Sequence, residues 1–120
     1  MNRAEFIAGF AALGCVVSER PSDFIVFDFE VPVGKFVGKK IQLGLQVTGD
    51  SPLNPPGGPH VSPQLLPLNQ AADPHPKGGI HKSGLGPEWQ YWSRPFKDWR
   101  EGERTARRYM AHIVNLFATQ

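Results

Sequence analysis

At 120 residues, with 40% hydrophobic and 20% charged side chains, the chain has the size and composition of one folded domain. Its 13 basic and 11 acidic side chains leave a formal net charge of +2, which is too small to indicate nucleic-acid or membrane binding by itself. The single cysteine, Cys15, excludes an internal disulfide and fits a reducing compartment.

The N-terminal segment predicts an amphipathic helix that runs to about Leu13. Asn2 is a favourable N-cap, the apolar residues from Phe6 to Leu13 recur with helical spacing, and Gly14 follows as a stop signal. Glu5 interrupts the apolar stretch, so we do not expect a secretory leader here. No stretch reaches the ~18 consecutive apolar residues of a membrane span, and we expect a cytoplasmic protein without membrane contact.

Two strands are predicted next, at residues 24–31 and 41–47. The first is rich in aromatic and β-branched residues, and the second alternates strictly between apolar and polar residues. Residues 33–38 contain two glycines and provide the turn between the strands. We expect an antiparallel hairpin with one face on the first helix and the other face in water.

Prolines and glycines gather between Val33 and Pro95, out of totals of 12 and 13. Because proline lacks a backbone donor, residues 48–70 are predicted to form an edge strand or extended coil and not a central strand. Apolar residues and the tryptophans lie in or beside this region, so we expect a long, ordered loop around the core rather than a disordered linker.

An aromatic cluster precedes the last predicted helix, and it contains all three tryptophans: Trp89, Trp92 and Trp99. Burial in the core is the favoured interpretation, and an exposed docking patch is the alternative. The helix is expected from Trp99 or Arg100 onward, with an apolar stripe between Ala106 and Phe117. The fold class is therefore predicted as α+β: one domain over residues 1–120, with a helix at each end of an antiparallel strand meander.

Three segments in this order resemble the ubiquitin-conjugating-enzyme superfamily. Residues 38–63 (GKKIQLGLQVTGDSPLNPPGGPHVSP) resemble its third strand and proline-rich turn, and residues 75–83 (HPKGGIHKS) resemble its His-Pro-Asn segment. Residues 89–99 (WQYWSRPFKDW) with the final helix resemble a bacterial branch called prokaryotic family E. The resemblance implies a component of a bacterial ubiquitin-like ligation pathway, in the setting of antiviral defence, with an activating enzyme and a modifier protein as partners.

The chain departs from that family at the residues that carry its chemistry. Lys77 follows His75-Pro76 where the family has asparagine, and the position of the family's cysteine falls on Leu85. No cysteine follows Cys15, which is itself expected to be a small buried hydrophobe at a helix–strand junction. The family's thioester mechanism therefore cannot be transferred to this sequence.

Ser83 is the hydroxyl closest to the vacant cysteine position, and it is our candidate nucleophile. A serine needs a neighbouring base, and His81 lies two residues away, on the same side of an extended segment. Nearby glycines would let backbone amides approach an oxyanion. The resemblance adds His75, from the His-Pro dipeptide, to the candidate catalytic residues. The sequence thus predicts an unconventional transferase that forms a serine oxyester.

Two other functions remain open. The first is an inactive adaptor that only binds the modifier or the activating enzyme. The second is a metal-binding module or hydrolase that uses the loop histidines His60, His75 and His81, although their spacing matches no compact ligand motif. No metal and no cofactor are predicted for the leading hypothesis, and nucleic acid is not an expected partner because the charges near the tryptophans are mixed.

Overall fold

The computed structural model describes residues 2–65, 80–93, 96 and 98–119. In chain order, these residues form α1 (Arg3–Ala12), β1 (Ser18–Arg20), β2 (Phe24–Glu30), β3 (Lys40–Gln46), β4 (His60–Ser62), β5 (Ile80–Lys82), β6 (Gln90–Trp92), the 3₁₀ turn η1 (Trp99–Glu101) and α2 (Ala106–Thr119). The strands make one six-stranded antiparallel sheet in the order β1-β2-β3-β4-β6-β5.

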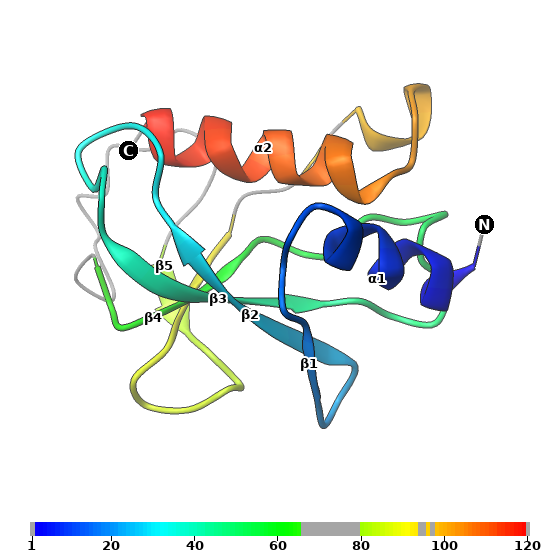
Figure 1. Cartoon of the computed structure of the whole chain (residues 1–120). Coiled ribbons are helices and arrows are strands. Elements are labelled where there is room, and N and C mark those ends of the chain that lie inside the picture. Colours follow the sequence, from blue (N-terminus) through cyan, green and yellow to red (C-terminus); the bar gives the residue numbers. More distant parts are fainter. Residues whose placement is uncertain (1, 66–79, 94–95, 97, 120) are drawn as a thin grey trace.

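Both α-helices lie on the same side of the sheet (Figure 1). The predicted α+β class is confirmed, with one helix before the strands and one after them in the chain. We call the helix-covered side the inner face and the opposite side the outer face. In the part of the chain that is described, neither helix has the length and hydropathy that a bilayer crossing requires.

The first helix begins where the sequence predicts. The Asn2 side chain accepts a hydrogen bond from the Glu5 amide at 2.9 Å, and the Glu5 carboxylate accepts one from the Asn2 amide at 3.2 Å. This reciprocal capping box satisfies two amides that the helix itself leaves free. Gly14 follows with a φ of 96°, a conformation that favours glycine. Cys15 packs against the core, and burial raises the pKa of its thiol, in agreement with an unreactive role.

The predicted hairpin is β2–β3, and its register assigns residues to the two faces. Ile25, Phe27, Leu43 and Leu45 point inward and are buried under the helices. Alternation in both strands produces this face, because successive side chains of a strand point to opposite sides.

The position of β4 contradicts the prediction that residues 48–70 contain no central strand. His60–Ser62 pairs with β3 on one side and with β6 on the other. Pro59 and Pro63 stand outside these three residues, so every residue of the strand keeps its backbone donor. The Pro59 carbonyl also accepts a hydrogen bond from the Trp92 amide at 2.9 Å, since proline retains its acceptor.

The final helix begins later than predicted, at Ala106 instead of Trp99 or Arg100. Trp99–Glu101 forms a separate 3₁₀ turn, and Gly102 follows it in an extended conformation. The Arg108 guanidinium holds this connection by donating to the carbonyls of Asp98, Trp99 and Glu103 at 2.7 to 2.9 Å. These bonds satisfy three carbonyl groups of the irregular segment and fix it against the first turn of α2.

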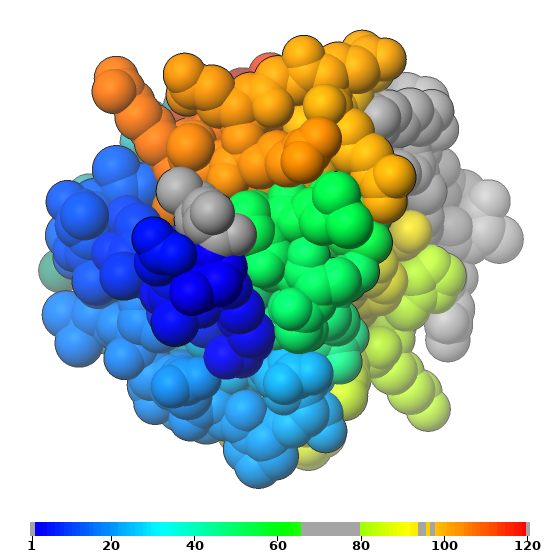
Figure 2. Space-filling model, turned by 90° about the vertical axis from the view of Figure 1, so that its right-hand side faces the viewer, coloured from blue at the N-terminus to red at the C-terminus, as the bar shows by residue number. Residues whose placement is uncertain are grey.

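The proline-rich loop of residues 47–59 connects β3 to β4 and is hydrogen-bonded to residues of η1 and α2. Trp99 donates from its indole nitrogen to the Pro52 carbonyl at 2.8 Å, and the Tyr109 hydroxyl donates to the Gly57 carbonyl. Figure 2 shows this green segment between α1 in blue and the orange residues before α2. Trp92 and Trp99 are at most 1% exposed, which confirms the core interpretation for these two tryptophans.

Candidate functional site

A row of residues crosses the outer face and includes His60, one member of the candidate site. Val26 lies opposite Gly44, Gly44 opposite His60, His60 opposite Tyr91, and Tyr91 opposite His81. Directly opposed residues share a face, so these five belong to one side of the sheet. The ring centroids of His60 and Tyr91 are 4.8 Å apart, and those of Tyr91 and His81 are 6.2 Å apart.

The connection between β5 and β6, residues 83–89, lies on the outer face, opposite the helices (Figure 1). We call it the outer loop. Gly44 makes room for it, because a Cβ added at Gly44 would lie 2.4 Å from Leu85 Cδ1 and 3.4 Å from the Trp89 ring. Gln64 holds the far end of the loop by donating to the Pro87 carbonyl at 3.0 Å. The outer loop can thus pack closely against the sheet because Gly44 has no side chain.

This packing brings Ser83 to His60. Ser83 Oγ lies 2.6 Å from His60 Nδ1, and it accepts a hydrogen bond from the Leu85 amide at 3.0 Å. A hydroxyl has one proton and two acceptor positions. The direction of the bond between Ser83 Oγ and His60 Nδ1 depends on the tautomer of His60. Ser83 can be activated as a nucleophile in the tautomer in which its hydroxyl donates to Nδ1. The imidazole then carries its own proton on Nε2.

The surroundings of His60 keep its ring neutral. The residue is only 8% exposed, and the Phe24 ring meets it edge-on with centroids 4.8 Å apart. Burial lowers the pKa of His60 from 6.5 to about 4, because removing water disfavours the charged imidazolium. Among the described residues, no carboxylate contacts His60 to oppose this effect. The ring is therefore an available proton acceptor at neutral pH, although a weak one.

A groove of about 580 Å³ on the outer face reaches His60. It runs beside the row Arg20–Phe24–Gln46, whose members lie opposite one another in β1, β2 and β3. The lining residues are Arg20, Pro21, Ser22, Phe24, Gln46, His60, Gly84 and Leu85. The groove is an open surface feature that reaches the Ser83–His60 pair at His60 and at Gly84, the residue after Ser83.

The structure distributes the sequence-predicted site residues unevenly. Ser83 is half-buried at the site, whereas His81 is exposed on β5 and faces Tyr91. No hydrogen bond joins His81 to Ser83 among the described residues, and the contact expected from His81 is made by His60 instead. His75 lies outside the described residues.

The metal hypothesis finds no further support in the part of the chain that is described. No group of three or more histidine, cysteine, aspartate or glutamate residues there has a metal-binding arrangement. His60 and His81 share the outer face, but the Tyr91 ring lies between them in the row.

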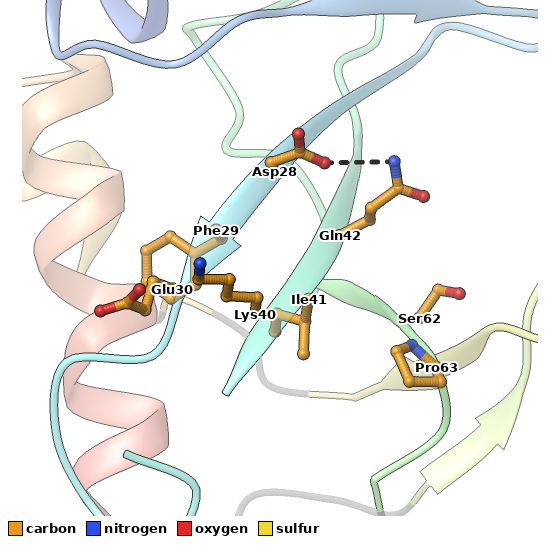
Figure 3. A pocket seen from close by; sticks show the side chains of 8 residues that line it. All are labelled: Asp28, Phe29, Glu30, Lys40, Ile41, Gln42, Ser62 and Pro63. Atoms are coloured by element: carbon orange, nitrogen blue, oxygen red, sulfur yellow. Dashed lines mark hydrogen bonds between the residues drawn. The ribbon is translucent and has the colours of Figure 1, made fainter. Parts of the chain in front are cut away.

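A second hollow, of about 500 Å³, occupies the other half of the outer face (Figure 3). Gln42 spans it by donating to Asp28 Oδ1 at 3.3 Å, as Figure 3 shows. Its lining combines Glu30 and Lys40 with Ser62, and none of these is joined to a histidine. This hollow lacks the paired nucleophile and base of the groove at His60, so it is not the candidate site.

Comparison with protein-family models, with curated proteins and with solved structures gives no match for this chain. The candidate site therefore rests on its own geometry. His60 was missed as the partner of Ser83 because the two residues are 23 positions apart in the sequence. The one available signal is the set of histidines at residues 60, 75 and 81, of which the sequence analysis considers His60 as a metal ligand only and not as a base.

Proposed function

We propose that this protein is an acyl-transfer component of a ubiquitin-like ligation pathway, in which Ser83 accepts the carboxyl end of a modifier protein as an oxyester. The 2.6 Å contact between Ser83 Oγ and His60 Nδ1 carries the proposal. A hydroxyl paired with a neutral imidazole is the minimal arrangement for nucleophilic acyl transfer. The order of sequence segments that resembles ubiquitin-conjugating enzymes supplies the class of donor.

The first step uses an acyl thioester as the donor. Ser83 Oγ attacks the thioester carbonyl while its proton passes to His60 Nδ1, and the carbon–oxygen bond of the ester forms. The carbon–sulfur bond then breaks, and the leaving thiolate takes the proton from the imidazolium. The Leu85 amide lies beside Ser83 Oγ and is the candidate donor to the oxyanion of the intermediate.

The second step transfers the acyl group to an amine. The amine attacks the ester carbonyl, the bond between carbon and Ser83 Oγ breaks, and an amide forms. The serine oxygen regains its proton from the amine through His60. This scheme returns the Ser83–His60 pair to its starting state.

A second candidate is a binding adaptor without catalysis, and the burial of His60 favours it. A base whose pKa is lowered to about 4 accepts a proton less readily than an ordinary histidine. In that role the bond between Ser83 and His60 only fixes the outer loop on the sheet. The two candidates differ in one observable, which is a covalent adduct on Ser83.

The test is intact-mass spectrometry of the purified protein after incubation with a ubiquitin thioester and, separately, with p-nitrophenyl acetate. We expect an adduct on Ser83 that resists thiols and is released by hydroxylamine. Ser83→Ala abolishes this adduct, and His60→Phe slows its formation about 100-fold, since a positioned base contributes a factor of roughly 10² or more.

Ser83→Cys and His81→Phe are the matched controls. The cysteine variant forms a thiol-sensitive adduct at the same position, which shows that the site is accessible to the donor. His81→Phe forms the ester at the wild-type rate, because no hydrogen bond joins His81 to Ser83. If the cysteine variant is loaded while the wild-type protein never is, the catalytic proposal is wrong and the adaptor role is favoured.

A further inference from the structure

The groove that leads to His60 carries a charge that the transfer chemistry does not use. Arg20 is the only charged residue among those that line the groove, since burial keeps His60 neutral. We propose that Arg20 makes the groove selective for an acyl donor with an acidic side chain about four residues before its reacting carbonyl. This selectivity rests on the proposed function, because it assumes that the donor reacts at Ser83.

The sheet register directs Arg20 to the groove and away from the nearest acidic neighbour in the sequence. Arg20 lies opposite Phe24 on the outer face, whereas Glu19 lies opposite Ile25 on the inner face. Glu19 is paired there with Arg3, 3.2 Å between the carboxylate and the guanidinium. Among the described residues, the hydrogen bond of the Arg20 guanidinium is the one from Nε to Ser18 Oγ, at 3.4 Å. Most of its donors therefore remain free for a ligand carboxylate.

The turn after Arg20 holds the rim of the groove in place. Ser22 and Asp23 have φ values of 63° and 67°, which are uncommon for residues other than glycine. The Ser22 carbonyl accepts a hydrogen bond from the Gln46 side chain at 3.1 Å, and the Asp23 carbonyl accepts one from the Val47 amide at 2.9 Å. Contacts with β3 and the residue after it thus fix the turn that borders the arginine.

The strand order gives the distance along the groove. Three strand spacings separate β1, which carries Arg20, from β4, which carries His60. The row of Arg20 meets β3 at Gln46 and the row of His60 meets it at Gly44, so the two rows are also offset by two residues. At about 4.8 Å for each spacing and about 3.3 Å for each residue along the strand, the backbone separation is about 16 Å, and the long Arg20 side chain covers part of it. An extended peptide covers about 3.3 Å per residue. A donor whose carbonyl is at Ser83 therefore has about its fourth preceding residue near Arg20. A carboxylate at that position meets the unpaired guanidinium.

The experiment uses three peptide thioesters of otherwise equal sequence. One has glutamate at the fourth residue before the thioester carbonyl, one has lysine there, and one has the glutamate moved to the eighth residue. Intact-mass spectrometry follows the rate of ester formation on Ser83. We expect the first peptide to react about fivefold faster than either of the others, the size of one exposed ion pair.

Arg20→Glu reverses the preference between the first two peptides, whereas Arg107→Glu, an exposed position on α2, leaves it unchanged. Equal rates for the three peptides on a wild-type protein that does form the Ser83 ester overturn the selectivity and leave the transfer function intact. A preference that persists in Arg20→Glu also overturns it.

Binding of the fluorescein-labelled peptide acids to Ser83→Ala, measured by anisotropy, separates the two proposals. If wild-type protein forms no ester but Ser83→Ala binds the glutamate-4 peptide more tightly than the lysine-4 peptide, the transfer function fails and the arginine subsite stands. If neither a rate preference nor a binding preference depends on Arg20, the subsite is absent.

Discussion

The two halves of the outer face are built from the same strands, β2 and β3, and differ completely in burial. In one half, Phe24, Val26 and Gly44 are buried, and the outer loop lies against Phe24 and Gly44. In the other half, Asp28 and Gln42 are exposed and joined only by a side-chain hydrogen bond. The inner face shows no such change along the strands, since its residues are buried under the helices from Ile25 to Val31, with Phe29 half-buried.

The difference shows what the outer loop does for the site. A sheet face that is left in water provides no means of lowering the pKa of a histidine or of holding a serine against it. Covering one half creates a small buried region on the outer side, and His60 lies at its edge with the groove beyond it. The site is therefore a property of the covered half, and variants that separate the two halves test this interpretation.

Paired substitutions at Val26 and Asp28 provide the strongest test. Val26 is 2% exposed, and Val26→Asp would bury a carboxylate without a partner on the covered half. We expect a loss of at least ~3 kcal/mol in the free energy of unfolding, measured by urea denaturation. Asp28→Asn, two residues along the same face, should change it by less than ~0.5 kcal/mol. Similar losses for the two variants would show that the two halves of the outer face do not differ in burial.

Gly44→Ala tests the close approach of the outer loop. The added methyl group would meet Leu85 Cδ1, so the leucine side chain must move away, and we expect a cost of about 2 kcal/mol. In the Gly44→Ala/Leu85→Ala double variant the added methyl group no longer meets the leucine side chain. We therefore expect the double variant to lose less unfolding free energy than the sum of the losses of the two single variants. Strict additivity would mean that the two residues do not touch. Gln42→Ala, on the open half, is the control without effect.

The pH dependence of stability tests the burial of His60. Its folded-state pKa, about 4, lies below the ordinary 6.5, so the unfolded chain binds more protons between these values. This contribution is complete above about pH 6.5 and is lost as the pH falls toward 4. One unit of pKa difference corresponds to about 1.36 kcal/mol of unfolding free energy. Solvent in the adjoining groove screens His60, so we expect its contribution to the unfolding free energy to be about 1–2 kcal/mol, less than the whole shift would give.

The measurement is the unfolding free energy from pH 4 to 8 for wild-type protein and His60→Phe. The phenylalanine ring keeps the aromatic contacts with Phe24 and Tyr91 but does not titrate, so the difference between the curves isolates the histidine. Parallel curves for wild type and His60→Phe would mean that His60 is solvated.

The elements with long local patterns were predictable from the sequence. The alternation of residues 41–47 and the cap at Asn2 involve neighbours in the chain, and both were found where expected. The three-residue strands β1, β5 and β6 are too short to show a period, and pairing with neighbouring strands defines them. The error at β4 came from applying the proline rule to a whole segment, when the prolines only flank the strand.

The candidate site was half predictable for a similar reason. Ser83 follows from the glycine-rich loop and the vacant cysteine position, which are local features of the sequence. Its partner depends on β6 lying between β4 and β5, and no local pattern near His60 reports that order. His81 was the nearest histidine in the sequence, but the row across the sheet separates it from Ser83 by placing it against Tyr91.

The missing side chain at Gly44 has a consequence for moving this site into another protein. The outer loop supplies the nucleophile, but its position depends on a glycine that comes 39 residues before Ser83 and belongs to a different strand. Grafting residues 83–89 onto a foreign hairpin would transfer the serine without the strand surface at Gly44 against which the loop packs. The smallest transferable unit contains β3, β4, β6 and β5 with the outer loop. Only this unit keeps both the contact of Leu85 with Gly44 and the hydrogen bond between Ser83 and His60.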